Sequence, residues 1–193
     1  NKKIVGIDEV GRGPLAGPVV AAAVALDEKF FLNENNLFRD SKTLSIKQKN
    51  IAFKNILTKS HIGIGISTSK EIDAKGISYC TKNAMYKAIQ ELEIIPDFVI
   101  IDAVKLESLK IPSISLIKGD QRCLSVAAAS IVAKISRDRM MRDIYEVKFP
   151  NYGFASNKGY GSKQHLESLN IFGPSKIHRM SFKPLSAINM KVE

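Results

Sequence analysis

Four carboxylates stand where a metal-dependent reaction could take place. Asp8 ends a short apolar run near the start of the chain and Glu9 follows it, while Asp102 ends a second apolar run. Asp120 comes just after a third such run and immediately before a long helical pattern. Because buried parallel strands place ligands beyond their carboxyl ends, Asp8 and Asp102 should meet if their two strands are neighbours.

A cluster of carboxylates without a cation among them would repel itself strongly. Hard divalent cations relieve that repulsion, and a ligand set made only of oxygens selects magnesium or manganese over zinc. Two such ions about 4 Å apart form a clamp for phosphodiester hydrolysis, because one activates water and the other stabilises the leaving oxygen. A single aspartate at a strand end is often only a solvated turn residue, but four of them together favour a metal site.

Other chemistries fit the sequence less well. The histidines are scattered and no serine lies in a nucleophile elbow, so a triad hydrolase is not expected, and we expect His165 and His178 to have structural or supporting roles. Gly11-Arg12-Gly13 matches neither a phosphate-binding loop nor a dinucleotide fingerprint. Cys80 and Cys123 share no zinc-ligand spacing, so we expect them to be buried as small hydrophobic residues.

The chain is strongly basic, with 29 Lys and Arg against 19 Asp and Glu and a formal net charge of +10. This excess favours an anionic polymer or surface as partner. With 193 residues, of which 45% are hydrophobic, the chain can form one domain with a full core. No run of about 18 apolar residues exists and the amino end lacks a signal-peptide pattern, so we expect no membrane contact and a cytoplasmic location.

The elements that carry the acids are expected to form an α/β sheet covered by helices. We expect strands at residues 3–8, 18–26, 61–69, 97–102 and 113–117, and helices at residues 45–58, 78–92 and 123–149. The continuous apolar run at 97–102 predicts a strand buried on both faces. Glycines alternate with isoleucines at 61–69, so a neighbouring element can approach that strand closely. Pro150 stops the last helix, and a glycine-rich basic loop and a tail with little pattern follow.

A series of motifs resembles the ribonuclease HII family. In chain order they are 6–23 (GIDEVGRGPLAGPVVAAA), 40–44 (DSKTL), 117–120 (IKGD), 126–134 (VAAASIVAK), 137–139 (RDR), 152–154 (YGF), 158–161 (KGYG) and 178–182 (HRMSF). The resemblance runs from about residue 4 to 185, which is nearly the whole chain. Val10 replaces the usual alanine and Ser162 a common threonine, and neither change removes a functional group.

The resemblance implies a ribonuclease H-like fold, a mixed five-stranded sheet flanked by helices with a small C-terminal helical segment. Residues 1–150 would form the catalytic core, and residues 151–193 a substrate-contacting loop and C-terminal segment packed on it, in one domain. The implied reaction is magnesium- or manganese-dependent hydrolysis of the RNA strand of RNA–DNA hybrids and cleavage 5′ of ribonucleotides embedded in duplex DNA. It leaves a 3′-hydroxyl and a 5′-phosphate, and we expect a monomer with two ions bound beside the substrate.

The family's functional residues carry over to named positions of this chain. Its catalytic, metal-binding carboxylates fall on the same four residues, Asp8, Glu9, Asp102 and Asp120. Its substrate contacts fall on Gly11, Arg12 and Gly13, whose backbone meets the 2′-hydroxyl, on Tyr160 beside the sugar, and on Ser41 and Lys42 near the substrate backbone. Reading a 2′-hydroxyl needs hydrogen-bonding groups close to the minor groove, and glycines permit that approach. A tyrosine adds a flat face and a hydroxyl.

Three other interpretations account for less of the sequence. A nucleic-acid-binding module without activity would have no need of all four acids. A junction resolvase or transposase core also uses carboxylates, but lacks the combination of Gly11-Arg12-Gly13 with Tyr160. A basic ribosomal or structural protein has no reason to end two buried strands in aspartate. The physiological metal, and the preference between single ribonucleotides and long hybrids, stay open.

Overall fold

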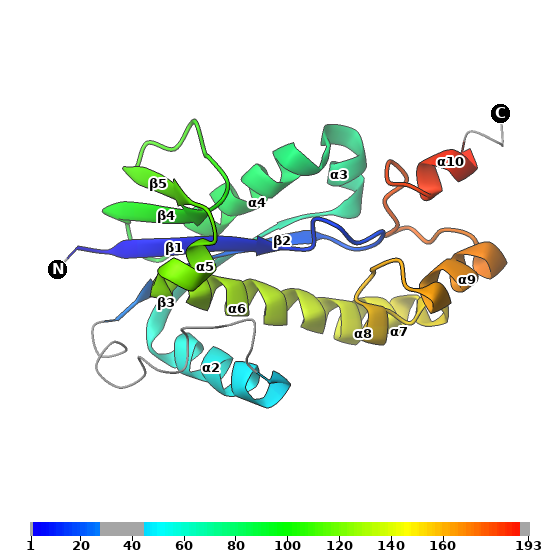
Figure 1. Ribbon diagram of the computed structural model, residues 1–193, viewed down its shortest axis with the longest axis horizontal. Coiled ribbons are helices and arrows are strands. Elements are labelled where there is room, and N and C mark those ends of the chain that lie inside the picture. The colour runs from blue at the N-terminus through cyan, green and yellow to red at the C-terminus, as the bar shows by residue number, and fades with distance from the viewer. Residues whose placement is uncertain (1, 28–44, 190–193) are drawn as a thin grey trace.

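The centre of the molecule is a five-stranded mixed sheet in the order β3-β2-β1-β4-β5 (Figure 1). The computed structural model describes residues 2–27 and 45–189. Its strands are β1 Ile4–Val10, β2 Val19–Leu26, β3 Ser60–Ser67, β4 Phe98–Asp102 and β5 Ser113–Leu116. β1 and β3 both run antiparallel to β2, whereas the β1–β4 and β4–β5 pairs are parallel. The mixed five-stranded sheet expected from the sequence is confirmed.

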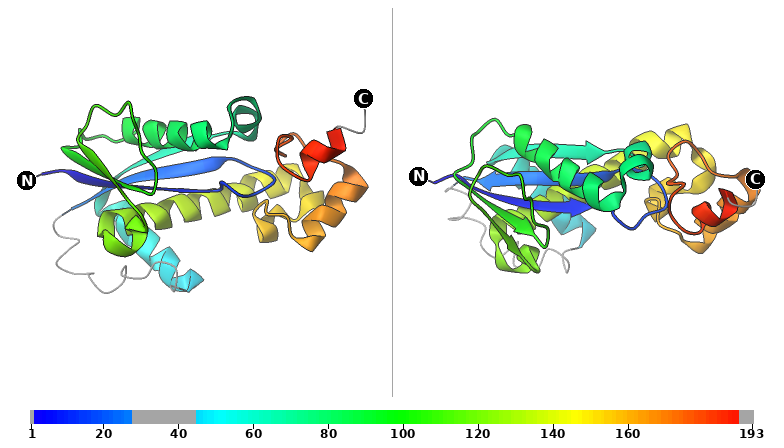
Figure 2. Two further views of the ribbon diagram at one scale, coloured as in Figure 1. Left: turned by 45° about the horizontal axis from the view of Figure 1, so that its top comes forward. Right: turned by 90° about the horizontal axis from the view of Figure 1, so that it is seen from above.

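Helices cover both faces of this sheet, as expected of an α/β fold. The helices are α2 Ile46–Thr58, α3 Ser69–Lys75, α4 Ile77–Gln90, α5 Gly119–Arg122, α6 Leu124–Arg139, α7 Glu146–Lys148, α8 Phe154–Asn157, α9 Lys163–Phe172 and α10 Leu185–Asn189. α3 and α4 lie on one face, and α6, with α2 beside it, lies on the other (Figures 1 and 2). No helix in the described ranges is long and apolar enough to cross a membrane.

Small residues let these helices pack directly on the strands. A Cβ atom at Gly65 would lie 1.9 Å from the carbonyl oxygen of Ala84 in α4, and one at Gly6 would lie 2.2 Å from the backbone of Ser125 in α6. Glycine is therefore required at both positions, because any side chain would push the helix away from the sheet. The expectation that a neighbour approaches β3 closely is confirmed.

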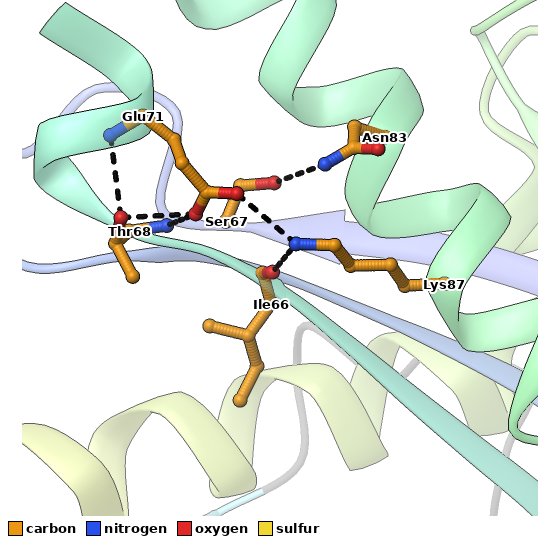
Figure 3. A network of polar contacts seen from close by, with 6 residues as sticks. All are labelled: Ile66, Ser67, Thr68, Glu71, Asn83 and Lys87. Atoms are coloured by element: carbon orange, nitrogen blue, oxygen red, sulfur yellow. Dashed lines mark hydrogen bonds and ion pairs between the residues drawn. The ribbon is translucent and has the colours of Figure 1, made fainter.

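A polar network fixes the end of β3 to α3 and α4 (Figure 3). Thr68 caps α3: its hydroxyl accepts the Glu71 N–H at 3.2 Å, and the Glu71 carboxylate accepts the Thr68 N–H at 2.6 Å. Lys87 of α4 donates to the Ile66 carbonyl at 2.8 Å and to Glu71 at 3.2 Å. These hydrogen bonds lower the pKa of Glu71, the backbone bond from Thr68 most of all. The capping box stabilises the start of α3. The sequence pattern did not predict this helix.

Two strand predictions need correction. β1 continues to Val10, so Asp8 and Glu9 lie within the strand rather than at and beyond its end. β4 is not buried on both faces: Val99 and Ile101 are buried, whereas Phe98 and Ile100 are only half-buried. The alternation arises because α5 and α6 cover the face toward Ile100 incompletely near the short, largely exposed strand β5. An apolar run alone does not distinguish these two degrees of burial.

The long helix expected at residues 123–149 is present, but it changes character along its length. α6 passes into a π-helical segment, Met140–Tyr145, and then into α7, so that the helical path ends at Lys148 before Pro150. A 3₁₀ turn follows at Pro150–Tyr152. Figure 1 shows this path extending past the carboxyl end of β1 toward α8 and α9.

The segment after Pro150 is more ordered than the sequence pattern predicts. It contains α8, α9 and α10, which agree with the small C-terminal helical segment that the family resemblance implies. Ser162 caps α9 by accepting the N–H of His165. A third hydrophobic cluster joins this segment to the core, with buried members Leu15, Ala16, Met141, Tyr152, Phe154, Leu169 and Leu185. Helix α9 was not predicted because its apolar residues Ile171 and Phe172 are exposed, which obscures the helical periodicity.

Candidate active site

The sheet brings three of the predicted acids together. β1 and β4 are adjacent parallel strands, and their register pairs Ile7 with Ile101, so Asp8 and Asp102 are the next residues along the two strands. Glu9 follows in β1, and the charges of Glu9 and Asp102 both act on Asp8. The hypothesis that the strands of Asp8 and Asp102 are neighbours is confirmed.

Asp8 is the most strongly perturbed of these groups. Burial raises its pKa to about 7, and the charges of Glu9 and Asp102 add to that effect. The Ser130 hydroxyl of α6 and the Glu9 N–H, at 2.7 Å, hydrogen-bond to the carboxylate and oppose the shift. Without a cation, Asp8 is therefore only partly ionised near neutral pH, which is the behaviour of a carboxylate in need of a positive partner.

Glu9 interacts both with Asp102 and with the half-exposed side chain of Arg12. Burial raises its pKa and the charge of Asp102 contributes, while Arg12 opposes the shift through an ion pair at 3.3 Å. The Arg12 side chain is half exposed, so it can leave Glu9 without a large desolvation change.

Asp102 and Asp120 are joined by a strained segment of backbone. The Gly119 N–H donates to Asp102 Oδ1 at 2.7 Å, which places α5 and its buried residue Asp120 beside the end of β4. Ala103, directly after Asp102, has φ 50°, and Lys118, directly before Gly119, has φ 56°. Left-handed conformations cost energy in residues other than glycine and concentrate at functional sites. The backbone on both sides of this contact is thus held in an unfavourable conformation.

The donor set fits a divalent cation in its chemistry. It consists of buried or half-buried carboxylates, of which Asp8, Glu9 and Asp102 act on one another, and Arg12 bonds to Glu9. Within the described ranges, no three Asp, Glu, His or Cys side chains already form an arrangement that could hold a metal ion. The carboxylates therefore lie in one region, but their side chains are not arranged around a common metal position.

The raised pKa of Asp8 predicts a pH effect on stability. In the metal-free protein, Asp8 binds its proton more tightly when folded than when unfolded, so its favourable contribution is complete below about pH 4 and is lost as the pH rises through about 7. Since one pKa unit corresponds to about 1.4 kcal/mol, Asp8→Asn should raise the free energy of unfolding at pH 8 by up to about 3–4 kcal/mol relative to wild type. Urea unfolding with a chelator at pH 4 and pH 8 measures this. An Asp8→Asn advantage that is equal at both pH values would contradict it.

The turn formed by Gly11, Arg12 and Gly13, the 11–13 turn, is held from behind by a buried arginine. Arg179 is fully buried and donates to the carbonyl oxygens of Gly11 at 2.6 Å and Arg12 at 2.9 Å. In a trans peptide the N–H points away from the C=O, so the N–H groups of Arg12 and Gly13 face away from Arg179. Within the described part of the chain, neither N–H has a hydrogen-bond acceptor. The 11–13 turn thus presents two adjacent donors outward.

A second buried arginine ties the segment just after this turn to the loop that carries Tyr160. Arg137 donates to the carbonyls of Pro18, Ala16 and Lys158 at 2.9, 3.1 and 2.9 Å. The tie brings Tyr160 against the turn, because a Cβ atom at Gly13 would lie 3.8 Å from the Tyr160 ring. The ring is 44% exposed and so remains available to a ligand. The two parts of the predicted ribose reader therefore lie side by side.

A basic groove runs beside Glu9 between α2 and α6. The part nearest the acids is lined by Glu9, Val10, Lys49, Ser130, Ile131, Lys134 and Ile135. The adjoining part is lined by Lys49, Asn50, Lys134, Ile135, Asp138, Arg139, Arg142 and Lys158. Among the described residues of this second part, five are basic and one is acidic. Such a surface attracts a polyanion.

The family model of Ribonuclease HII matches residues 5–185 of the chain. The chain belongs to the ribonuclease HII family. The Ribonuclease HII of Ligilactobacillus salivarius (strain UCC118) is 49% identical over 189 residues, which cover 97% of this chain and 72% of that relative. The crystal structure of the ribonuclease H2 from Pyrococcus horikoshii OT3 matches with a TM-score of 0.79 at 25% identity and covers 98% of both chains.

A more distant match supports the fold alone. The crystal structure of Bst-RNase HIII in complex with Mn²⁺ has a TM-score of 0.71 at 18% identity and covers 100% of this chain and 70% of that one. Membership of the ribonuclease HII family makes the protein a ribonuclease H, a hydrolase with endonuclease activity on RNA–DNA hybrids.

Of the residues that the sequence singled out for this family's chemistry, most fall within one region. The acids of β1, β4 and α5 lie at one end of the sheet, and the 11–13 turn and Tyr160 lie next to β1. Ser41 and Lys42 lie outside the described residues. His165 and His178 are buried, as expected of structural residues, whereas of the cysteines only Cys80 is buried and Cys123 is half-buried beside Ser125.

Three residues that shape the site were not predicted from the sequence. Ser130 bonds to Asp8, Arg179 holds the 11–13 turn, and Arg137 holds the chain just after that turn. The one signal in the sequence was Arg137, because a charged residue within a helix of small apolar residues needs hydrogen-bond partners. Apart from Lys158, which is 21 residues from Arg137, the partners of Arg137 and Arg179 are backbone carbonyls more than 100 residues away in the chain. Pro18 is 119 residues from Arg137, and Gly11 is 168 residues from Arg179. A sequence pattern does not show such partners.

Arg179 should be essential for stability in this ribonuclease HII fold. Arg179→Met leaves the buried carbonyls of Gly11, Arg12 and Gly17 without their donor, and each unsatisfied group costs about 1–3 kcal/mol. We expect Arg179→Met to lower the free energy of unfolding by about 3 kcal/mol or more, as measured by urea denaturation. Arg179→Lys keeps the charge but not the fork of donors, and should recover only part of the loss. Wild-type stability in the Met variant would contradict this role.

Proposed function

We propose that this ribonuclease HII hydrolyses the RNA strand of RNA–DNA hybrids and also cuts 5′ of ribonucleotides embedded in duplex DNA, leaving a 3′-hydroxyl and a 5′-phosphate. Asp8, Glu9, Asp102 and Asp120 are the catalytic residues. The observation that carries the proposal is the continuity of β1 with the 11–13 turn: one residue, Val10, separates the acidic pair from the turn that lies against Tyr160. A ribose held by the turn is thereby fixed relative to the carboxylates.

Metal binding at the four carboxylates follows from their chemistry. We expect magnesium or manganese to bind there as two ions when the substrate is bound. The ions would supply an activated water and stabilise the leaving oxygen. The chain's own contribution is to hold the carboxylates: Ser130 and the Glu9 N–H orient Asp8, and the Gly119 N–H orients Asp102. The ribonuclease HIII with the same fold was solved in complex with Mn²⁺, an ion that a ligand set of oxygens would suit.

Ribose recognition is assigned to the 11–13 turn and Tyr160. The outward N–H groups of Arg12 and Gly13 are donors that a 2′-hydroxyl oxygen can accept from, and the exposed Tyr160 ring offers a face to the sugar. Deoxyribose has no oxygen to accept these hydrogen bonds, so the site distinguishes the two sugars by chemistry as well as by shape. Ser41 and Lys42 are proposed as contacts to the substrate backbone.

The basic groove between α2 and α6 supports a duplex substrate. Lys49 and Lys134 line both of its parts, so the groove leads from Glu9 to Arg139, Arg142 and Lys158. Phosphates of the strands that flank the cleavage point can bind along it, and the affinity should fall steeply with salt. We propose that residues 1–150 and 151–193 act as one domain and that a monomer suffices, because the proposed site is complete within one chain.

Cleavage mapping tests the proposed reaction. A hybrid and a DNA duplex with a single ribonucleotide, each labelled at the 5′ end of the cut strand, are incubated with the protein and magnesium, and the products are resolved at single-nucleotide resolution. We expect cleavage on the 5′ side of the ribonucleotide, with new ends that ligate only through a 3′-hydroxyl and a 5′-phosphate. Products that carry a 2′,3′-cyclic phosphate would exclude hydrolysis by activated water.

A further inference from the structure

Two buried histidines lie behind Tyr160 in the C-terminal segment. His165 of α9 has 0% of its surface exposed and His178 has 2%, and their Nε2 atoms are 2.9 Å apart. The rings of Tyr152 and Phe154 surround them, with centroid distances of 4.9 Å from Tyr152 to His178 and 5.4 Å from Phe154 to His165. Hydrogen bonds join the two rings to each other, to Tyr160 and to Ser175.

The hydrogen bonds fix which nitrogen of each ring carries the proton. The Tyr160 carbonyl can only accept, so His165 Nδ1, at 2.8 Å, carries a proton and donates it. The Ser175 N–H can only donate, so His178 Nδ1, also at 2.8 Å, is the bare acceptor. The proton of neutral His178 then lies on Nε2 and is donated to the bare Nε2 of neutral His165. One directed chain therefore runs from Ser175 through both rings to Tyr160.

This chain of hydrogen bonds is complete only when both rings are neutral. Burial lowers the pKa of His165, and burial together with the proximity of His165 lowers the pKa of His178 to about 4. Both rings are thus uncharged at neutral pH, and every ring nitrogen has a partner of the right kind. A buried polar group that is fully satisfied in one arrangement holds its neighbours in that arrangement.

The chain of hydrogen bonds ends at the backbone of the residue assigned to the sugar. The Tyr160 carbonyl accepts from His165 and also from the Ser162 N–H at 2.8 Å, and its own N–H donates to Asn157 at 2.9 Å. Tyr160 is 44% exposed, so the position of its ring depends on how the backbone is held. At the other end, His178 precedes Arg179, which holds the carbonyls of the 11–13 turn. The histidine pair thereby links both halves of the ribose reader.

We propose that His165, with its tautomer set by His178, is a positioning residue that holds Tyr160 against the 11–13 turn and so sets the preference for a single embedded ribonucleotide. The inference rests on the proposed function of Tyr160. A lone ribonucleotide offers the protein one register, so a small displacement of Tyr160 reduces its cleavage. A long hybrid offers many registers and tolerates that displacement better.

Two amide variants of His165 separate positioning from stability. In His165→Asn the amide nitrogen lies near the place of Nδ1, so the bond to the Tyr160 carbonyl can be kept while the contact to His178 is lost. In His165→Gln the amide lies near the place of Nε2, so the contact to His178 can be kept while the bond to Tyr160 is lost. Leu169→Ala, a buried residue of the same helix and cluster, is the control for simple destabilisation.

The quantity to measure is the ratio of kcat/KM on a single-ribonucleotide duplex to kcat/KM on a long hybrid, with a melting curve for each variant. We expect His165→Gln to lower the ratio by about tenfold to 10²-fold, since displacements near 1 Å have effects of that size. His165→Asn and Leu169→Ala should keep the wild-type ratio although both melt at lower temperature. In a cycle with Tyr160→Ala, His165→Gln should lower the ratio no further, because both changes act through one ring.

Equal ratios in the Gln and Asn variants would overturn the positioning role. If Tyr160→Ala leaves the ratio unchanged, the proposed function of Tyr160 fails and the inference fails with it. If Tyr160→Ala lowers the ratio and His165→Gln does not, only the inference fails. Should the Gln variant not fold, ¹⁵N spectra of the wild-type imidazoles decide: we expect the proton on Nδ1 of His165 and on Nε2 of His178, and the reverse assignment would contradict the directed chain.

Discussion

Replacing any one of the four carboxylates by its amide should lower kcat on an RNA–DNA hybrid by at least about 10²–10³-fold while the protein stays folded. The substitutions are Asp8→Asn, Glu9→Gln, Asp102→Asn and Asp120→Asn. Each removes a charge that would hold a metal ion or orient water, so the loss falls on the transition state. Packing is preserved because an amide has nearly the shape of a carboxylate.

Single-turnover rates, substrate affinity and melting curves separate this effect from misfolding. Binding of the hybrid should persist in all four variants and weaken with salt as in wild type, since phosphate contacts dominate affinity. Asp97→Asn is a matched control, because Asp97 is an exposed aspartate just before β4 whose carboxylate accepts the Lys3 N–H at 2.7 Å. It should cleave at nearly the wild-type rate. Wild-type-like turnover in the Asp8 or Asp102 variant would refute the assignment.

Discrimination between ribose and deoxyribose should be larger still. The protein should cut a DNA duplex with one ribonucleotide about 10⁴-fold faster than the same duplex made of DNA alone, because a site built to hydrogen-bond a hydroxyl rejects the analogue that lacks it. Tyr160→Ala should reduce single-ribonucleotide cleavage more than hybrid cleavage. Tyr160→Phe should have a smaller effect, since its ring still packs on the sugar.

The alternative for Tyr160 is that its ring only anchors the loop. Tyr160→Ala would then lower both activities alike and reduce the melting temperature. Tyr79→Ala is the matched control, because Tyr79 is an exposed tyrosine of α4 and its ring contacts Lys75 rather than the site. It should leave the ratio of the two activities unchanged. Parallel losses in the Tyr160 variant on both substrates would show that the ring does not read the sugar.

The parts of this site that the sequence could predict are those with local patterns. Apolar runs that end in Asp8 and Asp102 predicted two buried strands, and the structure confirms that they are parallel neighbours. The helical pattern at residues 45–58 predicted α2, which begins after Ser45 with a capping box. Glycines within the strand after α2 predicted the close approach of a neighbouring element, which is α4. In each case the residues that determine the structural element lie close together in the sequence.

The remaining features depend on contacts between distant residues. Arg137 and Arg179 bind carbonyl oxygens, which carry no side-chain signature in the sequence. The partner of His165 Nδ1 is likewise a backbone carbonyl, that of Tyr160. The alternating burial of β4 depends on the exposure of its neighbour β5, which an apolar run does not encode. Tertiary contacts set these features, and local periodicity does not report them.

Incubation of the protein with a labelled DNA duplex that carries one ribonucleotide, with magnesium and with a chelator, tests the central claim most directly. We expect a single cut on the 5′ side of the ribonucleotide with magnesium, no product with the chelator, and no cut in the all-DNA duplex under either condition. Cleavage that persists in the chelator, or cleavage of the all-DNA duplex at a comparable rate, would contradict a metal-dependent enzyme that reads the 2′-hydroxyl.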